Sequence, residues 1–141
     1  MPDTCDSSVL IPALLGWHAG HHVARAVVRD RVTAIPAHVY VETFSALTRL
    51  LDPRRPSPAI AGAALAALDR RPLALPARAH LALIGRLAES GVGGGATYDA
   101  LIAATAQHHE HRLLTADRRA RATYDALGVD YEVVDLEVAT A

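Results

Sequence analysis

Short apolar runs of the kind that form β-strands alternate along the chain with longer segments in which apolar residues recur every three or four positions. This alternation predicts an α/β fold with a central, mainly parallel sheet of four to five strands flanked by helices, because parallel strands need a crossover segment between them. The first predicted strand is short and leads into Asp6, and the others span residues 32–35, 73–75, 112–116 and 131–134.

The segments between these strands have helical periodicity and end at residues that stop helices. The proline-rich residues 52–58, the glycine loop at 91–95 and Gly128 each interrupt the pattern. The predicted helices span residues 9–15, 18–30, 36–51, 59–68, 76–87, 98–109 and 118–127, and the tail at 137–141 is expected to fray.

The predicted helix at residues 36–51 carries large apolar side chains at helical spacing. Pro36 suits its first turn, where a missing N–H is harmless. We expect the apolar stripe to face the core; its members are Tyr40, Phe44, Leu47 and Leu51.

Length and composition favour a single globular domain, residues 1–141. The chain has 141 residues, of which 51% are hydrophobic and 21% charged, and it contains no internal repeat or linker. The N-terminus lacks a signal-peptide pattern, and no apolar stretch reaches the roughly 18 residues that a membrane span needs. A lone cysteine, Cys5, cannot form an intramolecular disulfide. We therefore expect a cytoplasmic protein without membrane association.

The charge balance does not exclude nucleic acid as a partner. The chain has 14 cationic residues against 15 acidic ones, and all of the cations are arginine. Arginine binds phosphate well through its planar guanidinium group. The absence of lysine also fits a compositional bias of an alanine-rich chain, which we consider the better explanation.

Four carboxylates lie at junctions of predicted elements: Asp6, Glu42, Asp99 and Asp117. Two follow predicted strands and Asp99 follows the glycine loop, so these three can meet at the carboxyl edge of the sheet. Glu42 lies nearly two turns into its helix, beside the apolar stripe. Each acid alone has a structural explanation as a helix cap, a first-turn charge or a solvated side chain. None of these explanations requires all four acids to lie at one edge of the sheet, so the four acids together indicate a site.

Clustered anions repel one another and need a cation to offset the repulsion. Oxygen ligands favour Mg²⁺ or Mn²⁺ over zinc, which usually recruits histidine or cysteine. Hydroxyl groups at Ser7, Ser8 and Thr115 can orient the carboxylates. The matching reaction is phosphodiester hydrolysis, in which such ions activate water and hold the phosphate.

Four segments of the chain together resemble the PIN-domain ribonucleases, and more narrowly the VapC toxins of toxin–antitoxin pairs. They are DSSVLIPAL, IPAHVYVETFSALTRL, GGGATYDALIAATA and RLLTADRRA. The resemblance implies a PIN fold, a four-acid magnesium or manganese site, RNA cleavage, a homodimer and a VapB-like antitoxin that inhibits the enzyme. It places Asp6, Glu42, Asp99 and Asp117 at the family's acidic positions, and Ser7 and Thr115 at its supporting hydroxyl positions.

The N-terminus departs from the family pattern, in which an apolar strand runs into the first aspartate. Here that stretch is MPDTC, which predicts that strand one is short or has an imperfect edge, and which makes Asp3 a rival to Asp6 as the first ligand. We favour Asp6 because the helical segment SSVLI follows it directly.

Arginines on either side of Asp117 are candidates for binding the RNA backbone: Arg112, Arg118 and Arg119. A solvated surface is an equally good explanation for them. The histidines of HAGHH and HHEH have metal-compatible spacing, but we interpret them as solvated or RNA-facing because no third ligand is fixed.

Two other functions remain open from the residues. A phosphatase with an aspartyl nucleophile would need a D-x-D pair after the first strand, where this chain has Asp6, Ser7 and Ser8. A non-catalytic PIN-like module that binds RNA or protein could keep its acids without cleaving anything, and an absence of divalent metal binding would favour it.

Overall fold

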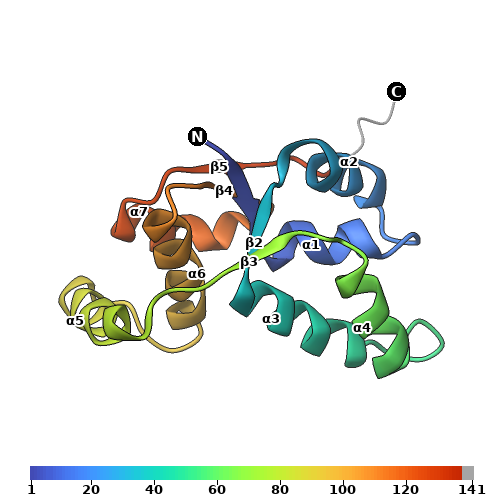
Figure 1. The fold of residues 1–141 in the computed structure, drawn as a ribbon, viewed down its shortest axis with the longest axis horizontal. Coiled ribbons are helices and arrows are strands. Elements are labelled where there is room, and N and C mark those ends of the chain that lie inside the picture. The colour runs from blue at the N-terminus through green and yellow to red at the C-terminus, as the bar shows by residue number, and fades with distance from the viewer. Residues whose placement is uncertain (138–141) are drawn as a thin grey trace.

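The computed structural model describes residues 1–137, and within them five strands form a parallel arrangement (Figure 1). Strands β1, β4 and β5 form one sheet in the order β1-β4-β5, and β2 pairs with β3. A bridge between Asp3 and Val32 joins the two sheets. The strands are β1 (Asp3–Cys5), β2 (Ala34–Pro36), β3 (Arg71–Leu73), β4 (Arg112–Thr115) and β5 (Tyr131–Val133). The predicted α/β fold and its parallel pairing are confirmed.

Helices cover the strands on two sides, with α1 to α4 on one side and α5 to α7 on the other in the view of Figure 1. Gly91 and Gly128 have positive φ angles and end α5 and α7, as expected of glycine after a helix. The helices are α1 (Ser7–Leu14), α2 (His21–Arg31), α3 (Ala37–Thr48), α4 (Pro58–Ala66), α5 (His80–Ser90), α6 (Ala96–His108) and α7 (Arg121–Leu127), with short 3₁₀ turns at Ala77–Ala79 and Arg118–Ala120. The tail predicted to fray spans residues 137–141, and residues 138–141 lie outside the described part of the chain.

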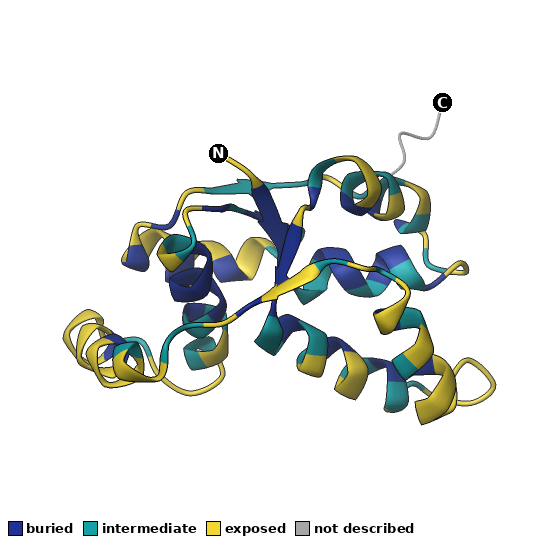
Figure 2. Cartoon of the chain, in the orientation of Figure 1, coloured by how far each residue is buried: buried dark blue, intermediate teal, exposed yellow. Residues whose placement is uncertain are grey.

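Strand β1 is short, as predicted, and it is interior to the arrangement of strands. It lies between β4 and the start of β2, and all three of its residues are buried (Figure 2). Its polar residues have partners: Thr4 Oγ1 donates to the Ala34 carbonyl oxygen at 2.7 Å. Asp3 pairs with Arg31 at 3.0 Å and with Arg112 at 3.2 Å. Asp3 is therefore committed to two guanidinium groups at the start of β1, away from the end where Asp6 lies.

The predicted apolar stripe of α3 is confirmed for Leu47, which is buried, and for Tyr40, which packs against the core, but it is wrong for Phe44 and Leu51. The buried residues of the helix are Val39, Thr43 and Leu47, whereas Phe44 and Leu51 are exposed. Leu51 lies beyond the end of the helix at Thr48, and one residue of offset turns a helical face by about 100°. The helix therefore packs on α1 through smaller side chains than the sequence suggested.

No helix among residues 1–137 is long and apolar enough to span a membrane.

Candidate active site

The four predicted acids come from four separate elements. Asp6 directly follows β1 and caps α1, and Asp117 follows β4 and caps the 3₁₀ turn at 118–120. Asp99 lies in the first turn of α6, and Glu42 lies in the second turn of α3. Their charges act on one another, because the carboxylates of the other three raise the pKa of Asp99. The four acids are therefore close enough to interact electrostatically, and we call them the carboxylate cluster.

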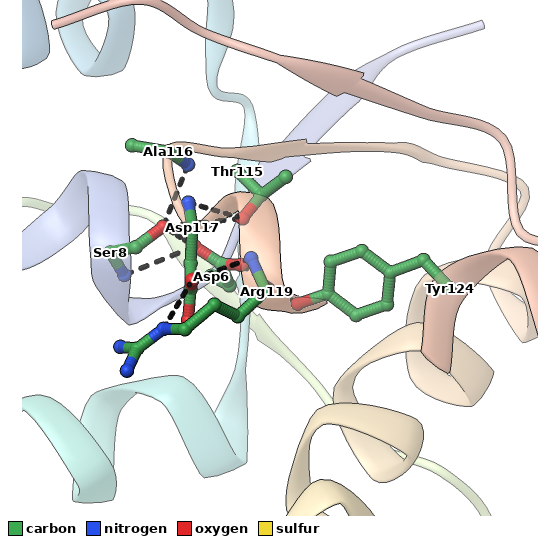
Figure 3. Close-up of polar contacts among 7 residues, drawn as sticks. All are labelled: Asp6, Ser8, Thr115, Ala116, Asp117, Arg119 and Tyr124. Carbon is green, nitrogen blue, oxygen red and sulfur yellow. Dashed lines mark hydrogen bonds and ion pairs between the residues drawn. The ribbon is translucent and has the colours of Figure 1, made fainter. Parts of the chain in front are cut away.

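Asp6 is the most buried of these acids, with 4% of its surface exposed. Its Oδ1 accepts hydrogen bonds from the backbone N–H and the hydroxyl of Ser8, and its Oδ2 accepts one from the Tyr124 hydroxyl at 2.7 Å (Figure 3). Burial raises the pKa of Asp6, and hydrogen bonds from Ser8, Thr115 and Tyr124 oppose that rise. These donors partly offset the effect of burial, and they hold the Asp6 carboxyl group in one orientation.

Hydroxyl groups also tie the end of β4 to α1. Ser8 Oγ accepts from the Ala116 backbone N–H at 2.7 Å and lies 3.3 Å from Thr115 Oγ1. Thr115 Oγ1 in turn accepts from the Asp117 backbone N–H at 3.1 Å. Figure 3 shows these contacts around Asp6 and Asp117. The first and fourth acidic positions are therefore held as one unit.

Ser7, the other predicted hydroxyl, contacts a different acid. Its Oγ donates a hydrogen bond to Glu42 Oε1, and His38 Nε2 lies 3.5 Å from Glu42 Oε2. The two contacts link the first turn of α1 to the polar face of α3.

Asp99 has the strongest electrostatic signature of a crowded anionic site. Its pKa is raised to about 6, mainly by partial burial and then by the charges of the three other carboxylates. The Arg119 guanidinium opposes this rise. A carboxyl group destabilised by its neighbours is characteristic of functional sites.

The three predicted RNA-binding arginines lie in different places. Arg119 is exposed and contacts Asp117 Oδ1 through its Nε at 3.3 Å, and Arg118 is exposed beside it. Arg112 begins β4, at the opposite end of the strand from Asp117, and its guanidinium pairs with Asp3. Of the three, only Arg118 and Arg119 lie beside Asp117 of the carboxylate cluster.

The histidines of both clusters bond mainly to nearby backbone groups. His18 Nδ1 accepts from the Gly20 N–H at 2.9 Å, and His21 Nδ1 lies 2.9 Å from the Pro12 carbonyl oxygen. His109 Nε2 lies 2.8 Å from the Ala74 carbonyl oxygen. Among residues 1–137 no three histidine, cysteine, aspartate or glutamate side chains are placed to hold one metal ion together.

That result also applies to the four acids, whose side chains are close enough to repel but are not gathered at ligand distances from one point. Their chemistry nevertheless fits a hard divalent cation, because they offer only oxygen atoms and their mutual repulsion lacks a full countercharge. Holding an ion would require Glu42 and Asp99, which have fewer hydrogen bonds than Asp6, to turn toward it.

Tyr124 is the site residue that the sequence analysis missed. It lies in α7, fully buried, and reaches an aspartate 118 positions earlier in the chain. Its only sequence signal is its place in a helix after the fourth acidic segment, and such a helix commonly carries a tyrosine simply as a core residue.

Comparison with known proteins shows the family and the fold of the chain. Residues 4–126 match the model of the PIN domain family. Ribonuclease VapC40 of Mycobacterium tuberculosis strain H37Rv is 45% identical over 130 residues, covering 92% of this chain and 96% of the relative. Ribonuclease VapC27 of the same strain is 39% identical over 128 residues, covering 91% and 93%.

A solved structure has the same fold. The crystal structure of VapBC2 from Rickettsia felis, bound to a DNA fragment from the promoter of the pair, contains a chain that matches with a TM-score of 0.66. The match covers 96% of this chain and 100% of that chain at 16% sequence identity.

Proposed function

The chain belongs to the PIN-domain family and is VapC-like, and we propose that it is the toxin of a toxin–antitoxin pair. In this proposal the toxin is a metal-dependent endoribonuclease whose active site is the carboxylate cluster. The observation that carries the proposal is that four separate elements bring Asp6, Glu42, Asp99 and Asp117 close together, so that after burial the charges of the other three acids raise the pKa of Asp99. A protein gains nothing in stability from such crowding, so the arrangement is best explained by a bound cation.

Asp6, Glu42, Asp99 and Asp117 would hold one or two Mg²⁺ or Mn²⁺ ions. Such an ion supplies Lewis-acid chemistry for hydrolysis of a phosphodiester bond. The protein's own part is to fix the acids: Ser8 and Tyr124 hold Asp6, and Thr115 holds the backbone at Asp117. Because donors occupy both oxygens of Asp6, its orientation is set before substrate binds.

Arg118 and Arg119, which are exposed beside Asp117, are proposed to contact the phosphates of RNA. The contact would make binding weaken as salt is added. Arg112 has no part in this proposal, because it lies at the far end of β4.

The proposed function is tested by removing metal. The purified protein is expected to cleave single-stranded RNA with Mg²⁺ or Mn²⁺, to stop after exhaustive chelation with EDTA, and to recover when either ion is returned. Gel analysis of a labelled RNA measures each step. Cleavage that persists without metal would contradict the four-carboxylate mechanism, and an absence of divalent binding by calorimetry would favour a binding module instead.

The partners proposed from the family are a VapB-like antitoxin and a second copy of the chain. The carboxylate cluster would attract a cationic side chain of an inhibitor, just as Arg119 already contacts Asp117. Co-purification of a small protein that suppresses RNA cleavage would support the antitoxin. An active toxin that no such protein inhibits would contradict it.

The homodimer proposal is supported by an exposed apolar pair on α5. Leu81 and Ile84 lie about one turn apart and are 80% and 57% exposed. Burying such side chains in water-free contact favours association. Ile84→Glu is expected to convert a dimer to a monomer in sedimentation equilibrium, whereas Leu51→Glu, at an exposed loop position, should leave the mass unchanged. A wild-type protein that sediments as a monomer would overturn the proposal.

A further inference from the structure

Two aromatic rings stack on each other beside the carboxylate cluster. His38 of α3 and Tyr98 of α6 are parallel to within 1°, with ring centroids 5.4 Å apart. Tyr98 directly precedes Asp99, and His38 lies 3.5 Å from Glu42. We call this pair the His38–Tyr98 shelf. It links the two helices that carry Glu42 and Asp99.

The shelf presents aromatic surface to solvent. Tyr98 is 56% exposed, although burial of an aromatic ring is favourable. One face of each ring is taken by the other ring, so the outward part of Tyr98 remains available. A partner that stacks on it would recover the apolar contact that the folded chain leaves unused.

A groove of about 280 Å³ adjoins the shelf, and His38 belongs to both. Its walls are mainly apolar, from Ala37, Val41, Leu75 and Leu101, with the hydroxyl-bearing Thr105 at one wall. No arginine, aspartate or glutamate lines it among the described residues. A flat ligand with apolar faces and a few polar edge atoms suits such walls, whereas a bare phosphate does not.

We propose that the His38–Tyr98 shelf and its groove bind an unpaired nucleobase of the RNA beside the carboxylate cluster. The inference rests on the proposed ribonuclease function and adds to it the residues that hold a base of the substrate. A base inside a duplex is stacked on both faces and cannot lie on the shelf, whereas a base in a loop or single strand can. The arginines beside Asp117 hold the backbone while the shelf holds the base.

The test uses a short single-stranded RNA that the wild-type protein cleaves with Mg²⁺. Tyr98→Ala is expected to lower kcat/KM by about 5- to 100-fold, mostly through KM, since stacking acts in both the bound substrate and the transition state. Tyr98→Phe keeps the ring and should restore the wild-type KM, and Tyr98→Leu, apolar without a ring, should not. The wild type should bind an RNA with an abasic nucleotide beside the cleaved bond as weakly as Tyr98→Ala binds the intact RNA. Tyr98→Ala should bind the abasic and the intact RNA equally.

Mn²⁺ titration and sedimentation separate this inference from its rivals. Tyr98→Ala should bind Mn²⁺ as tightly as the wild type and keep its oligomeric state. A lower Mn²⁺ affinity would overturn the proposal in favour of structural support of Asp99, and a changed mass would assign Tyr98 to a protein interface. An unchanged kcat/KM in Tyr98→Ala would overturn the shelf alone, whereas a wild type that cleaves no RNA would contradict the proposed function.

Discussion

Asp99→Asn is expected to abolish RNA cleavage and, in metal-free buffer, to make the protein more stable. Asparagine has nearly the same shape as aspartate but lacks its charge, so the variant removes a metal ligand without opening a cavity. Because loss of an outer hydrogen-bond partner of a metal ligand already costs 10- to 100-fold, loss of a ligand should lower cleavage by at least ~10²-fold.

The gain in stability follows from the direction of the pKa shift. The pKa of Asp99 is raised from 3.8 to about 6, so the folded protein binds a proton more tightly there than the unfolded chain does. The wild type therefore loses stability as pH rises from below 4 through 6, and the loss is complete at neutral pH. After allowance for solvent screening of this half-buried group, the cost is about 1–2 kcal/mol, which Asp99→Asn would relieve.

Both effects are measurable on one preparation. Thermal unfolding in EDTA at pH 7.5 should show a melting temperature a few degrees higher for Asp99→Asn, and the difference should shrink toward pH 4. Asp130→Asn, at an exposed acid before β5, serves as the matched control and should change neither cleavage nor stability. Undiminished cleavage by folded Asp99→Asn would remove Asp99 from the active site, and a lower melting temperature would contradict the crowding of the acids.

The largest loss of stability is expected from Tyr124→Ala. The side chain is fully buried, stacks at a tilt on Tyr131 with centroids 5.5 Å apart, and donates its hydroxyl to Asp6. Removing a buried aromatic ring typically costs about 3–5 kcal/mol, and this variant also leaves the buried Asp6 carboxylate with one donor fewer. A domain of this size is stabilised by only about 5–15 kcal/mol, so we expect Tyr124→Ala to unfold at a much lower temperature than the wild type.

Tyr124→Phe separates packing from orientation, because it deletes only the hydroxyl. We expect it to lose about 1–3 kcal/mol of stability and to bind Mn²⁺ about 10- to 100-fold more weakly, since Asp6 is no longer held by two sides. Urea unfolding and Mn²⁺ titration measure the two effects.

Tyr131→Phe is the matched control for Tyr124→Phe, because it removes a hydroxyl that bonds to Asp125 at an exposed position. It should match the wild type in both measurements. Wild-type Mn²⁺ affinity in Tyr124→Phe would show that the hydrogen bond to Asp6 serves stability alone.

The elements that the sequence predicted well are those whose signals are local. The segment that forms β4 is a compact apolar run, and Leu83 and Leu87 of α5 are buried as their helical spacing suggests. Gly128 ends α7 where a left-handed residue is needed. In each case a few neighbouring residues contain the whole signal.

The features that the sequence did not reveal depend on distant residues. The polar strand β1 is interior because Arg31 and Arg112, 28 and 109 positions away, neutralise Asp3. A periodicity argument also cannot tell which of two adjacent stripes on α3 faces the core, since Val39 and Tyr40 both begin an apolar series at helical spacing. Only the packing of α1 and α6 against that helix decides between them.

The acids themselves were found from their positions at element junctions, but their roles in the site remain a proposal that the variants above test. What the sequence could not supply was the difference among them. Asp6 is immobilised by three neighbouring groups, whereas Asp99 is held mainly by the start of its helix, and this contrast exists only once Ser8, Thr115 and Tyr124 are assembled.

The buried hydrogen bond between Tyr124 and Asp6 also gives the protein a built-in spectroscopic reporter. All four tyrosines lie within residues 1–137, and Tyr124 alone among them is fully buried. Its hydroxyl proton is shielded from exchange with water, so in a protein labelled at the tyrosine ring carbons its NMR signal can be distinguished from the other three. A change in the charge or coordination of Asp6 would shift that one signal. Metal binding at the carboxylate cluster would therefore be measurable without RNA and without any substitution.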